Sequence, residues 1–147
     1  MRLFMLLAVM LVVGCGKTEP KAKSSADEHH EVPITEADVK MPANYAEAVP
    51  QIKSYRDTIR GAIEALTPSE AHRALDELDI VLDKLPSIAK DSGIPKEQWE
   101  TVNLSARELR DAFNQLHAAI DENREPDYQA VAGPIDQAIA KLEGVTQ

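Results

Sequence analysis

Apolar residues recur at alternating steps of three and four along most of this chain, in four separate segments. The segments cover about residues 43–66, 68–91, 95–123 and 127–143 of the 147-residue sequence. In the first segment, for example, the series is Tyr45, Ala48, Ile52, Tyr55, Ile59, Ala62 and Leu66. This spacing places the apolar side chains on one face of a helix. Because such a face must be buried against other helices, the pattern predicts an all-α four-helix bundle.

The breaks between the segments are short and carry helix start and stop signals. Thr67, Pro68 and Glu70 supply a capping residue, a proline suited to the first helical position and an acidic residue three positions after the cap. Gly93 suits the left-handed backbone that often ends a helix, and Pro126 separates the last two segments. Connections of about one to four residues make each helix turn back along its predecessor. We therefore predict an up-down antiparallel bundle.

Three prolines, Pro50, Pro86 and Pro134, fall inside the helical segments. A proline in a helix interior removes one backbone hydrogen bond and bends the helix. All three lie off the apolar stripe, so we predict that each one bends its helix around the core. The alternative is that a kink opens a pocket.

The first residues of the chain have the layout of a secretory signal. Arg2 precedes an apolar run, residues 3–13, and the chain turns polar directly after Gly14 and Cys15. This run is too short for a transmembrane helix, which needs about 20 apolar residues. An ordinary cleaved signal would leave Cys15, the only cysteine, as an unpaired thiol in an oxidising compartment.

The sequence Val12-Val13-Gly14-Cys15 resembles the lipobox of bacterial lipoproteins. The resemblance implies that the chain is cleaved before Cys15 and that acyl chains on this cysteine hold the protein on a membrane of the cell envelope, facing the periplasm. The residue after the cysteine is Gly16 and not aspartate, which favours the outer membrane over the inner membrane. An ordinary secreted protein is the alternative.

These patterns divide the chain into three regions. Residues 1–14 are predicted to be a lipoprotein signal peptide, residues 15–41 the lipidated cysteine with a flexible tether, and residues 42–147 the bundle. The tether mixes charged and small polar residues without apolar periodicity, so it cannot bury enough surface to fold. A flexible coil of this length spans on the order of 30 Å.

Composition excludes several classes of function. The formal net charge of −9 argues against a nucleic-acid partner, because nucleic acids require basic patches. A single cysteine excludes an internal disulfide and any multi-cysteine metal site. The sequence contains no nucleophile elbow, phosphate-binding loop or metalloprotease motif. We therefore expect that the protein is not an enzyme.

The histidines form two pairs. His29 and His30 lie among acidic residues of the tether, where a flexible backbone does not fix metal ligands. His72 lies near the start of the second helix and His117 near the end of the third, which puts both at one level of an antiparallel pair. We therefore name His72 and His117 as a candidate metal site, and two exposed surface histidines are the alternative.

The acidic residues expected near His72 and His117 bear on which class of metal site this pair could form. Glu64 and Asp127 are the acidic residues that we expect near the same end of the bundle. Bundle-core carboxylate sites of the ferritin-like type need a glutamate three residues before a histidine. Those positions hold Ser69 and Asn114 here, so the sequence disfavours that class of enzyme.

The order of elements from about residue 70 to residue 144 resembles the small periplasmic b-type cytochromes, which are up-down four-helix bundles. The resemblance lies in Ala74-Leu75, Leu109-Arg110-Asp111-Ala112-Phe113, Ala118-Ala119-Ile120 and the alanine-rich fourth segment. It implies haem held by a methionine near the start of the first helix and a histidine near the end of the last. Met41 matches the first position, and the end of the fourth segment has no histidine.

We therefore expect a membrane-anchored lipoprotein of the cell envelope that acts as a non-enzymatic binding or structural module without a cofactor. Its partners would be the membrane, through the lipid on Cys15, and a protein of the envelope. Leu104 on the outer side of the third helix is a candidate contact for that protein. The alternative is a cytochrome-like bundle that binds haem or a transition metal and transfers electrons.

Overall fold

The computed structural model describes residues 34–146, and these residues form helices and no strand. The predicted all-α fold of four helices is confirmed. The described elements are the 3₁₀ helix η1 (Glu36–Asp38), α1 (Tyr45–Glu64), the 3₁₀ helix η2 (Pro68–Ala71), α2 (His72–Asp91), α3 (Lys96–Asp121) and α4 (Tyr128–Glu143).

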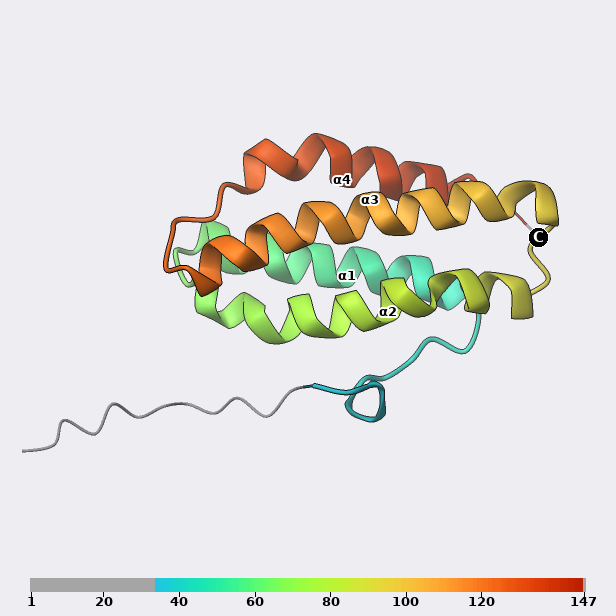
Figure 1. Ribbon diagram of the computed structural model, residues 1–147, viewed down its shortest axis with the longest axis horizontal. Coiled ribbons are helices and arrows are strands. Elements are labelled where there is room, and N and C mark those ends of the chain that lie inside the picture. The colour runs from blue at the N-terminus through green and yellow to red at the C-terminus, as the bar shows by residue number, and fades with distance from the viewer. Residues whose placement is uncertain (1–33, 147) are drawn as a thin grey trace, which may run out of the picture. The chain divides into compact units, whose positions relative to one another are not determined.

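The four long helices lie side by side, and each runs antiparallel to the helix before it (Figure 1). Helix α2 packs between α1 and α3, and α4 packs on α3 and closes the ring against α1. The packing of α1 on α4 is less extensive than that of the other neighbouring pairs. The bundle therefore has one seam that is more open than the rest.

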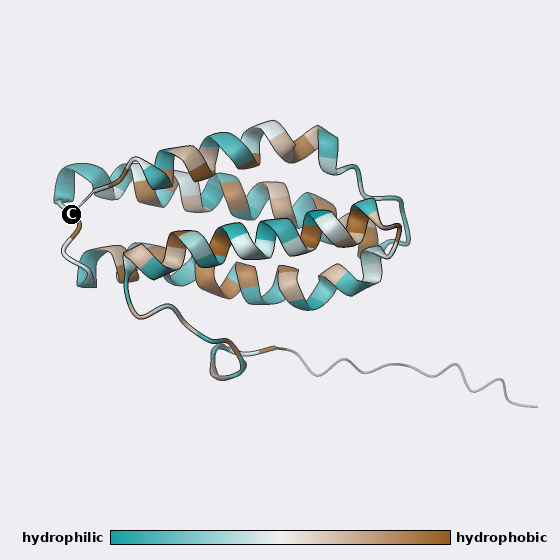
Figure 2. Cartoon of the chain, turned by 180° about the vertical axis from the view of Figure 1, so that it is seen from behind, coloured by the Kyte–Doolittle hydropathy of each residue, from teal (hydrophilic) through white to brown (hydrophobic). Residues whose placement is uncertain are grey.

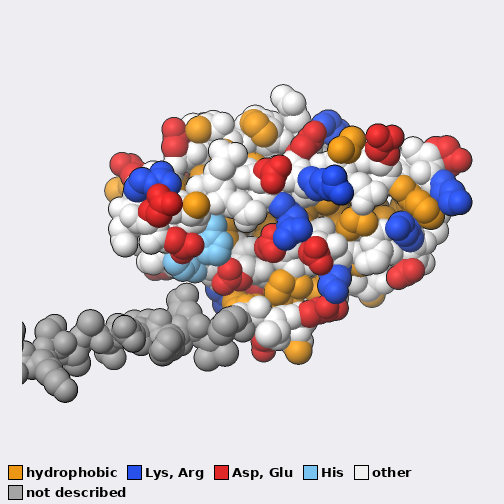
Figure 3. Space-filling view, in the orientation of Figure 1, with side chains coloured by type: hydrophobic (Ala, Val, Ile, Leu, Met, Phe, Trp, Pro, Cys, Tyr) orange, Lys and Arg blue, Asp and Glu red, His pale blue; other side chains and the backbone are white. Residues whose placement is uncertain are grey.

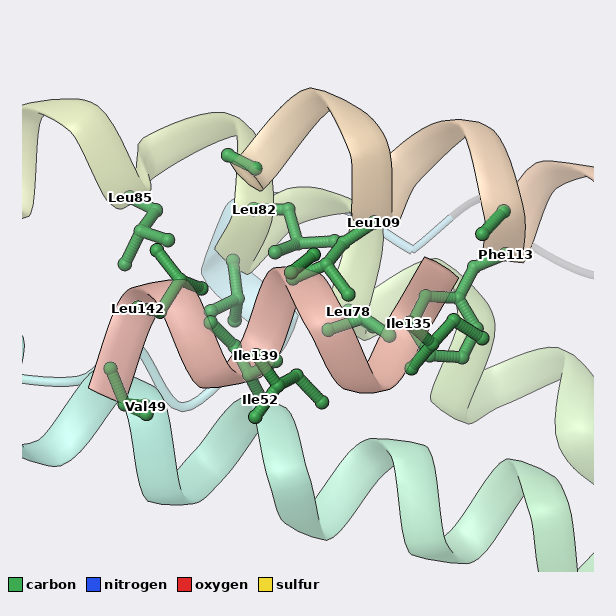
Figure 4. Close-up of a cluster of buried hydrophobic side chains, with 14 of the residues drawn as sticks. Val49, Ile52, Leu78, Leu82, Leu85, Leu109, Phe113, Ile135, Ile139 and Leu142 are labelled. Atoms are coloured by element: carbon green, nitrogen blue, oxygen red, sulfur yellow. The ribbon is translucent and has the colours of Figure 1, made fainter. Parts of the chain in front are cut away.

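The core contains the apolar stripes that the spacing predicted. Hydrophobic and hydrophilic residues alternate along every helix (Figure 2). Ile52, Leu78, Leu109 and Ile135, one residue from each long helix, are fully buried. Figure 4 shows these side chains and their neighbours pointing into the space between the helices. Complete burial of one such side chain contributes about 1.5–3 kcal/mol, so this shared core is the main source of stability.

The helix starts differ from one another in how they are capped. The Asn44 side chain accepts a hydrogen bond from the backbone N–H of Glu47, and Asp127 does the same for Ala130 at the start of α4. The cap predicted at Thr67 is not formed by its side chain. The first turn there is the 3₁₀ helix η2, and α2 begins at His72, four residues later than the sequence predicted.

Helices α1, α2 and α3 are each followed, two residues after the helix end, by a residue with left-handed backbone conformation. Gly93 has a φ of 80°, as predicted, whereas Leu66 and Asn123 adopt φ values of 60° and 52° without being glycine. At each of these ends, the backbone N–H of the residue after the left-handed residue donates a hydrogen bond to a carbonyl of the last helical turn. Thr67 N–H, for example, donates to the Ala62 carbonyl at 2.9 Å.

The three prolines lie inside α1, α2 and α4, and each helix continues through its proline. Pro50 and Pro134 are exposed and Pro86 is half-buried, so all three lie off the buried stripe. In each helix the lost N–H is the donor to the carbonyl four residues earlier. The sequence placed these residues correctly, and the bend at each of them stays a prediction.

The packed region begins before the predicted boundary at residue 42. Val39 is 7% exposed and belongs to the core, and Ile34 and Met41 pack against it. The Glu36 carboxylate of η1 lies 2.8 Å from Lys84 Nζ of α2. Residues 34–41 are thus part of the folded unit, because their few apolar side chains pack against the core of the bundle. The earlier part of the predicted tether lies outside the described residues.

Candidate functional site

The fold brings His72 and His117 together at the end of the bundle where α2 begins and α3 ends. Their ring centroids are 5.3 Å apart, and the ring planes cross at 61°. Figure 3 shows the histidines as one pale-blue patch among acidic side chains. Each histidine follows a fully buried residue, Ala71 or Leu116, so both lie at the rim of the core as predicted.

Two aspartates complete this cluster. Asp121 Oδ1 lies 3.6 Å from His72 Nε2 and 3.7 Å from His117 Nε2. Asp76 Oδ1 lies 3.8 Å from His117 Nε2. The ligating atoms of His72, His117 and Asp121 all lie within 4.8 Å of one another. We call these four residues the His–Asp cluster.

The cluster is open to solvent on one side. The His72 and His117 side chains are 24% and 27% exposed, and that of Asp121 is 57% exposed. The histidines are therefore half-buried, which differs from the fully exposed surface histidines that were the alternative to a metal site. An ion from solvent can reach the carboxylate side, while the imidazole rings are held by the helices behind them.

The acidic residues that the sequence predicted for this end have other roles. The Glu64 carboxylate accepts a hydrogen bond from Arg60 Nε at 2.7 Å within α1. Asp127 caps α4. The sequence-based prediction did not include Asp76 and Asp121, because the ferritin-like motif places the acidic residue three positions before the histidine and not after it. The signal that finds them is a histidine followed four residues later by an aspartate, which occurs once on α2 and once on α3.

A hollow of about 530 Å³ adjoins His72. It lies between the α1–α2 and α3–α4 connections and is lined in part by Leu66, Pro68, Ile120 and Pro126. Leu66 is 79% exposed, more than the other exposed large apolar side chain of the described residues, Leu104. His72 thus contributes both to the His–Asp cluster and to the wall of an apolar hollow.

A larger groove of about 960 Å³ runs between α1 and α4 along the open seam. Its walls include Tyr45, Val49, Ile94, Leu142 and Val145. We call it the α1–α4 groove. Helix α1 also contributes several small residues to the lining, including Ala46, Pro50, Ser54 and Thr58. Pockets of this size with mostly apolar walls and a few polar groups are typical of small-molecule sites.

Ion pairs join the two sides of this groove. Lys53 Nζ of α1 lies 2.6 Å from Glu143 Oε1 of α4. Arg56 Nη1 lies 3.5 Å from Asp136 Oδ1 of α4, and Arg56 Nη2 lies 2.9 Å from Asp57 Oδ1. Of these residues, Lys53, Asp57 and Glu143 line the groove and form its polar border. Ion pairs at the protein surface contribute only about 0–1 kcal/mol each to stability.

Tyr45 closes one end of the groove and connects three parts of the fold. Its hydroxyl donates to the Leu142 carbonyl of α4 at 3.0 Å, and its backbone N–H donates to Ser92 Oγ at 2.8 Å. The side chain is only 4% exposed. Burial raises the pKa of Tyr45 to about 12, because the phenolate would lose its hydration.

Of the remaining predicted sites, Leu104 lies among the described residues. Cys15, His29 and His30 lie outside the described residues. Leu104 is 49% exposed on α3, as predicted. Within residues 34–146, no helix combines the length and the apolar character needed to cross a membrane.

No model of a known protein family matches the chain, and neither a curated protein nor a solved structure matches it. The resemblances to lipoproteins and to b-type cytochromes therefore stay predictions.

Proposed function

We propose that this chain is a bacterial lipoprotein, anchored through acyl chains on Cys15 and facing the periplasm. The observation that carries the proposal is the only cysteine of the chain directly after the apolar run and Gly14. One acyl chain gives marginal binding to a membrane, whereas two or more give a stable anchor. Gly16 after the cysteine favours the outer membrane.

In this proposal the bundle is a non-enzymatic binding module, and the α1–α4 groove is its binding surface. The groove has apolar walls, including Val49 and Leu142, and a polar border at Lys53 and Glu143. Such a surface suits a small amphipathic molecule whose apolar part lies along the walls and whose polar end reaches the border. A protein of the envelope that docks on the exposed Leu104 is the other partner that the sequence suggests.

The anchor is tested by replacing its attachment point. Cys15→Ser should move the protein from the membrane fraction to the soluble periplasmic fraction, because serine is not the acceptor for the lipid. Ser25→Ala, an equally small change in the tether, should leave the protein on membranes. Fractionation followed by immunoblotting measures the distribution. Retention of Cys15→Ser on membranes would contradict the lipid anchor.

The haem-binding alternative gains no support from the positions of its expected ligands. Met41 lines a hollow of about 680 Å³ together with Pro42, Glu47 and Tyr55, at the end of the bundle where α1 begins. Among residues 34–146, no histidine lines that hollow. His72 and His117 lie at the other end, where α2 begins and α3 ends. Met41 and these two histidines therefore lie at opposite ends of the bundle.

A further inference from the structure

The His–Asp cluster consists of two equivalent pairs on neighbouring helices. His72 and Asp76 are four residues apart on α2, and His117 and Asp121 are four residues apart on α3. Residues at this spacing lie one above the other on the same face of a helix. Because α2 and α3 are antiparallel and pack extensively, the two pairs face each other across the helix interface. We propose that the His–Asp cluster binds one divalent transition-metal ion, with Zn²⁺ as the best match.

The distances within the cluster agree with a shared metal ion. The four ligand atoms around a tetrahedral zinc ion, each about 2.0–2.1 Å from the metal, lie about 3.3 Å from one another. Here the separations between histidine nitrogen and aspartate oxygen are 3.6, 3.7 and 3.8 Å. The ligand atoms of His72, His117 and Asp121 all lie within 4.8 Å of one another, and Asp76 approaches this group beside His117.

The donor types select the class of metal. Two imidazole nitrogens and two carboxylate oxygens suit Zn²⁺ and its neighbours Co²⁺, Ni²⁺ and Cu²⁺. Mg²⁺ and Ca²⁺ prefer sites made only of oxygen atoms, so the histidines disfavour them. The two aspartates also balance the charge of a divalent cation when both imidazoles are neutral.

The core behind the cluster keeps its ligands in place. Leu75 and Leu78 of α2 and Phe113 and Leu116 of α3, which are close in sequence to the four ligands, are buried in the core. Ligands on packed helices are positioned more accurately than ligands on loops. A bound ion would connect the start of α2 to the end of α3 and would therefore stabilise the folded state. This inference is independent of the lipid anchor and of the α1–α4 groove.

The test uses the full chain, purified in detergent and freed of metal with a chelator, and then titrated with Zn²⁺ in a calorimeter. We expect binding of one equivalent and a rise in the thermal unfolding midpoint. His117→Ala and Asp121→Asn should each weaken zinc binding by about tenfold or more and remove the rise. Asp111→Asn, the same change at an exposed position of α3, should leave zinc binding unchanged.

Two further measurements separate this site from its rivals. Replacing His29 and His30 together by alanine should leave zinc binding intact, and loss of binding in that variant would assign the metal to the tether and overturn the proposal. Co²⁺ in place of Zn²⁺ should give the visible absorption of a tetrahedral site. Circular dichroism verifies that each variant is folded. A folded wild-type chain that binds no Zn²⁺, or a folded Asp121→Asn that binds it unchanged, would also overturn the proposal.

Discussion

Tyr45 shows how one buried residue can make the stability of this fold depend on pH. Its hydroxyl is satisfied by the Leu142 carbonyl, and its ring fills the space where α1 meets the end of α4. Only the neutral phenol fits this environment. Ionisation would place a negative charge beside a carbonyl oxygen in a site with little water, and this unfavourable state is the cause of the raised pKa.

We expect the free energy of unfolding to fall as pH rises between about 10 and about 12. The unfolded chain releases the Tyr45 proton near its ordinary pKa of 10, whereas the folded chain keeps it to about 12. The folded state therefore binds more protons in this window, and the stability present below about pH 10 is lost as pH rises. Two pKa units correspond to about 3 kcal/mol. Urea unfolding at a series of alkaline pH values measures this loss.

Tyr45→Phe provides the control for this prediction. The variant should lose about 1 kcal/mol at neutral pH, because the Leu142 carbonyl loses its hydrogen bond. It should also show a shallower alkaline decline. The remaining decline would come from Tyr55 and Tyr128, whose pKa values are also raised by burial. An unchanged decline in Tyr45→Phe would assign the effect to other groups.

At the level of single helices, the helix ends depart most from the sequence-based prediction. Gly93 occupies a left-handed position at the end of α2, where glycine has no steric penalty. Leu66 occupies the equivalent position at the end of α1 with a φ of 60° and an exposed side chain. The sequence of the α1–α2 connection does not predict this conformation, because Leu66 continues the apolar series of the first helix and is not a glycine.

These two positions make a matched pair of opposite predictions. Leu66→Gly should stabilise the fold by about 1 kcal/mol, because it removes the strain of a left-handed leucine. Gly93→Ala should destabilise it by a similar amount, since an added Cβ meets no neighbouring atom there and only the backbone conformation opposes it. Chemical denaturation of both variants measures the changes. Equal effects of the same sign would contradict this explanation of the helix ends.

At the level of the whole molecule, the unequal packing of the helices creates the candidate binding surface. Helices α2 and α3 pack extensively on each other, whereas α1 and α4 make the least extensive contact of the neighbouring pairs. The two helices are held there by Tyr45 and by exposed ion pairs such as Lys53 with Glu143. The groove therefore lies at the most open seam of the bundle.

Filling this groove should weaken its binding of a ligand. Ala46→Trp places a large side chain at an exposed position of the wall and leaves the core unchanged. We expect it to weaken binding of the amphipathic dye anilinonaphthalene sulfonate by about tenfold, equivalent to about 1.4 kcal/mol. Fluorescence titration measures the affinity. Ala118→Trp, on the exposed face of α3, should have no effect. Equal dye binding in the wild type and Ala46→Trp would exclude the groove as the binding surface.

The sequence by itself determined the fold class, because the three-four spacing of apolar residues depends only on helix geometry and on the need to bury one face. Residues such as Ile52, Leu78 and Leu109 are buried as this spacing predicts. The short connections determined the antiparallel order, because a connection of a few residues makes each helix turn back along its predecessor. The lipobox resemblance around Cys15 also comes from the sequence alone, and fractionation of the Cys15→Ser variant tests the lipid anchor that it implies.

Only the tertiary structure decided which side chains meet. His72 and Asp121 are far apart in the sequence, and the relative shift and rotation of α2 and α3 bring their atoms to 3.6 Å. Apolar spacing identifies the buried face of a helix but not how far it slides along its neighbour, and a shift of one turn would separate these residues by about 5.4 Å. The same reason explains why the α1–α4 groove and the packing of Val39 on the core could not be predicted. These features depend on how the helices pack against one another, and the residue pattern within a single helix does not specify that packing.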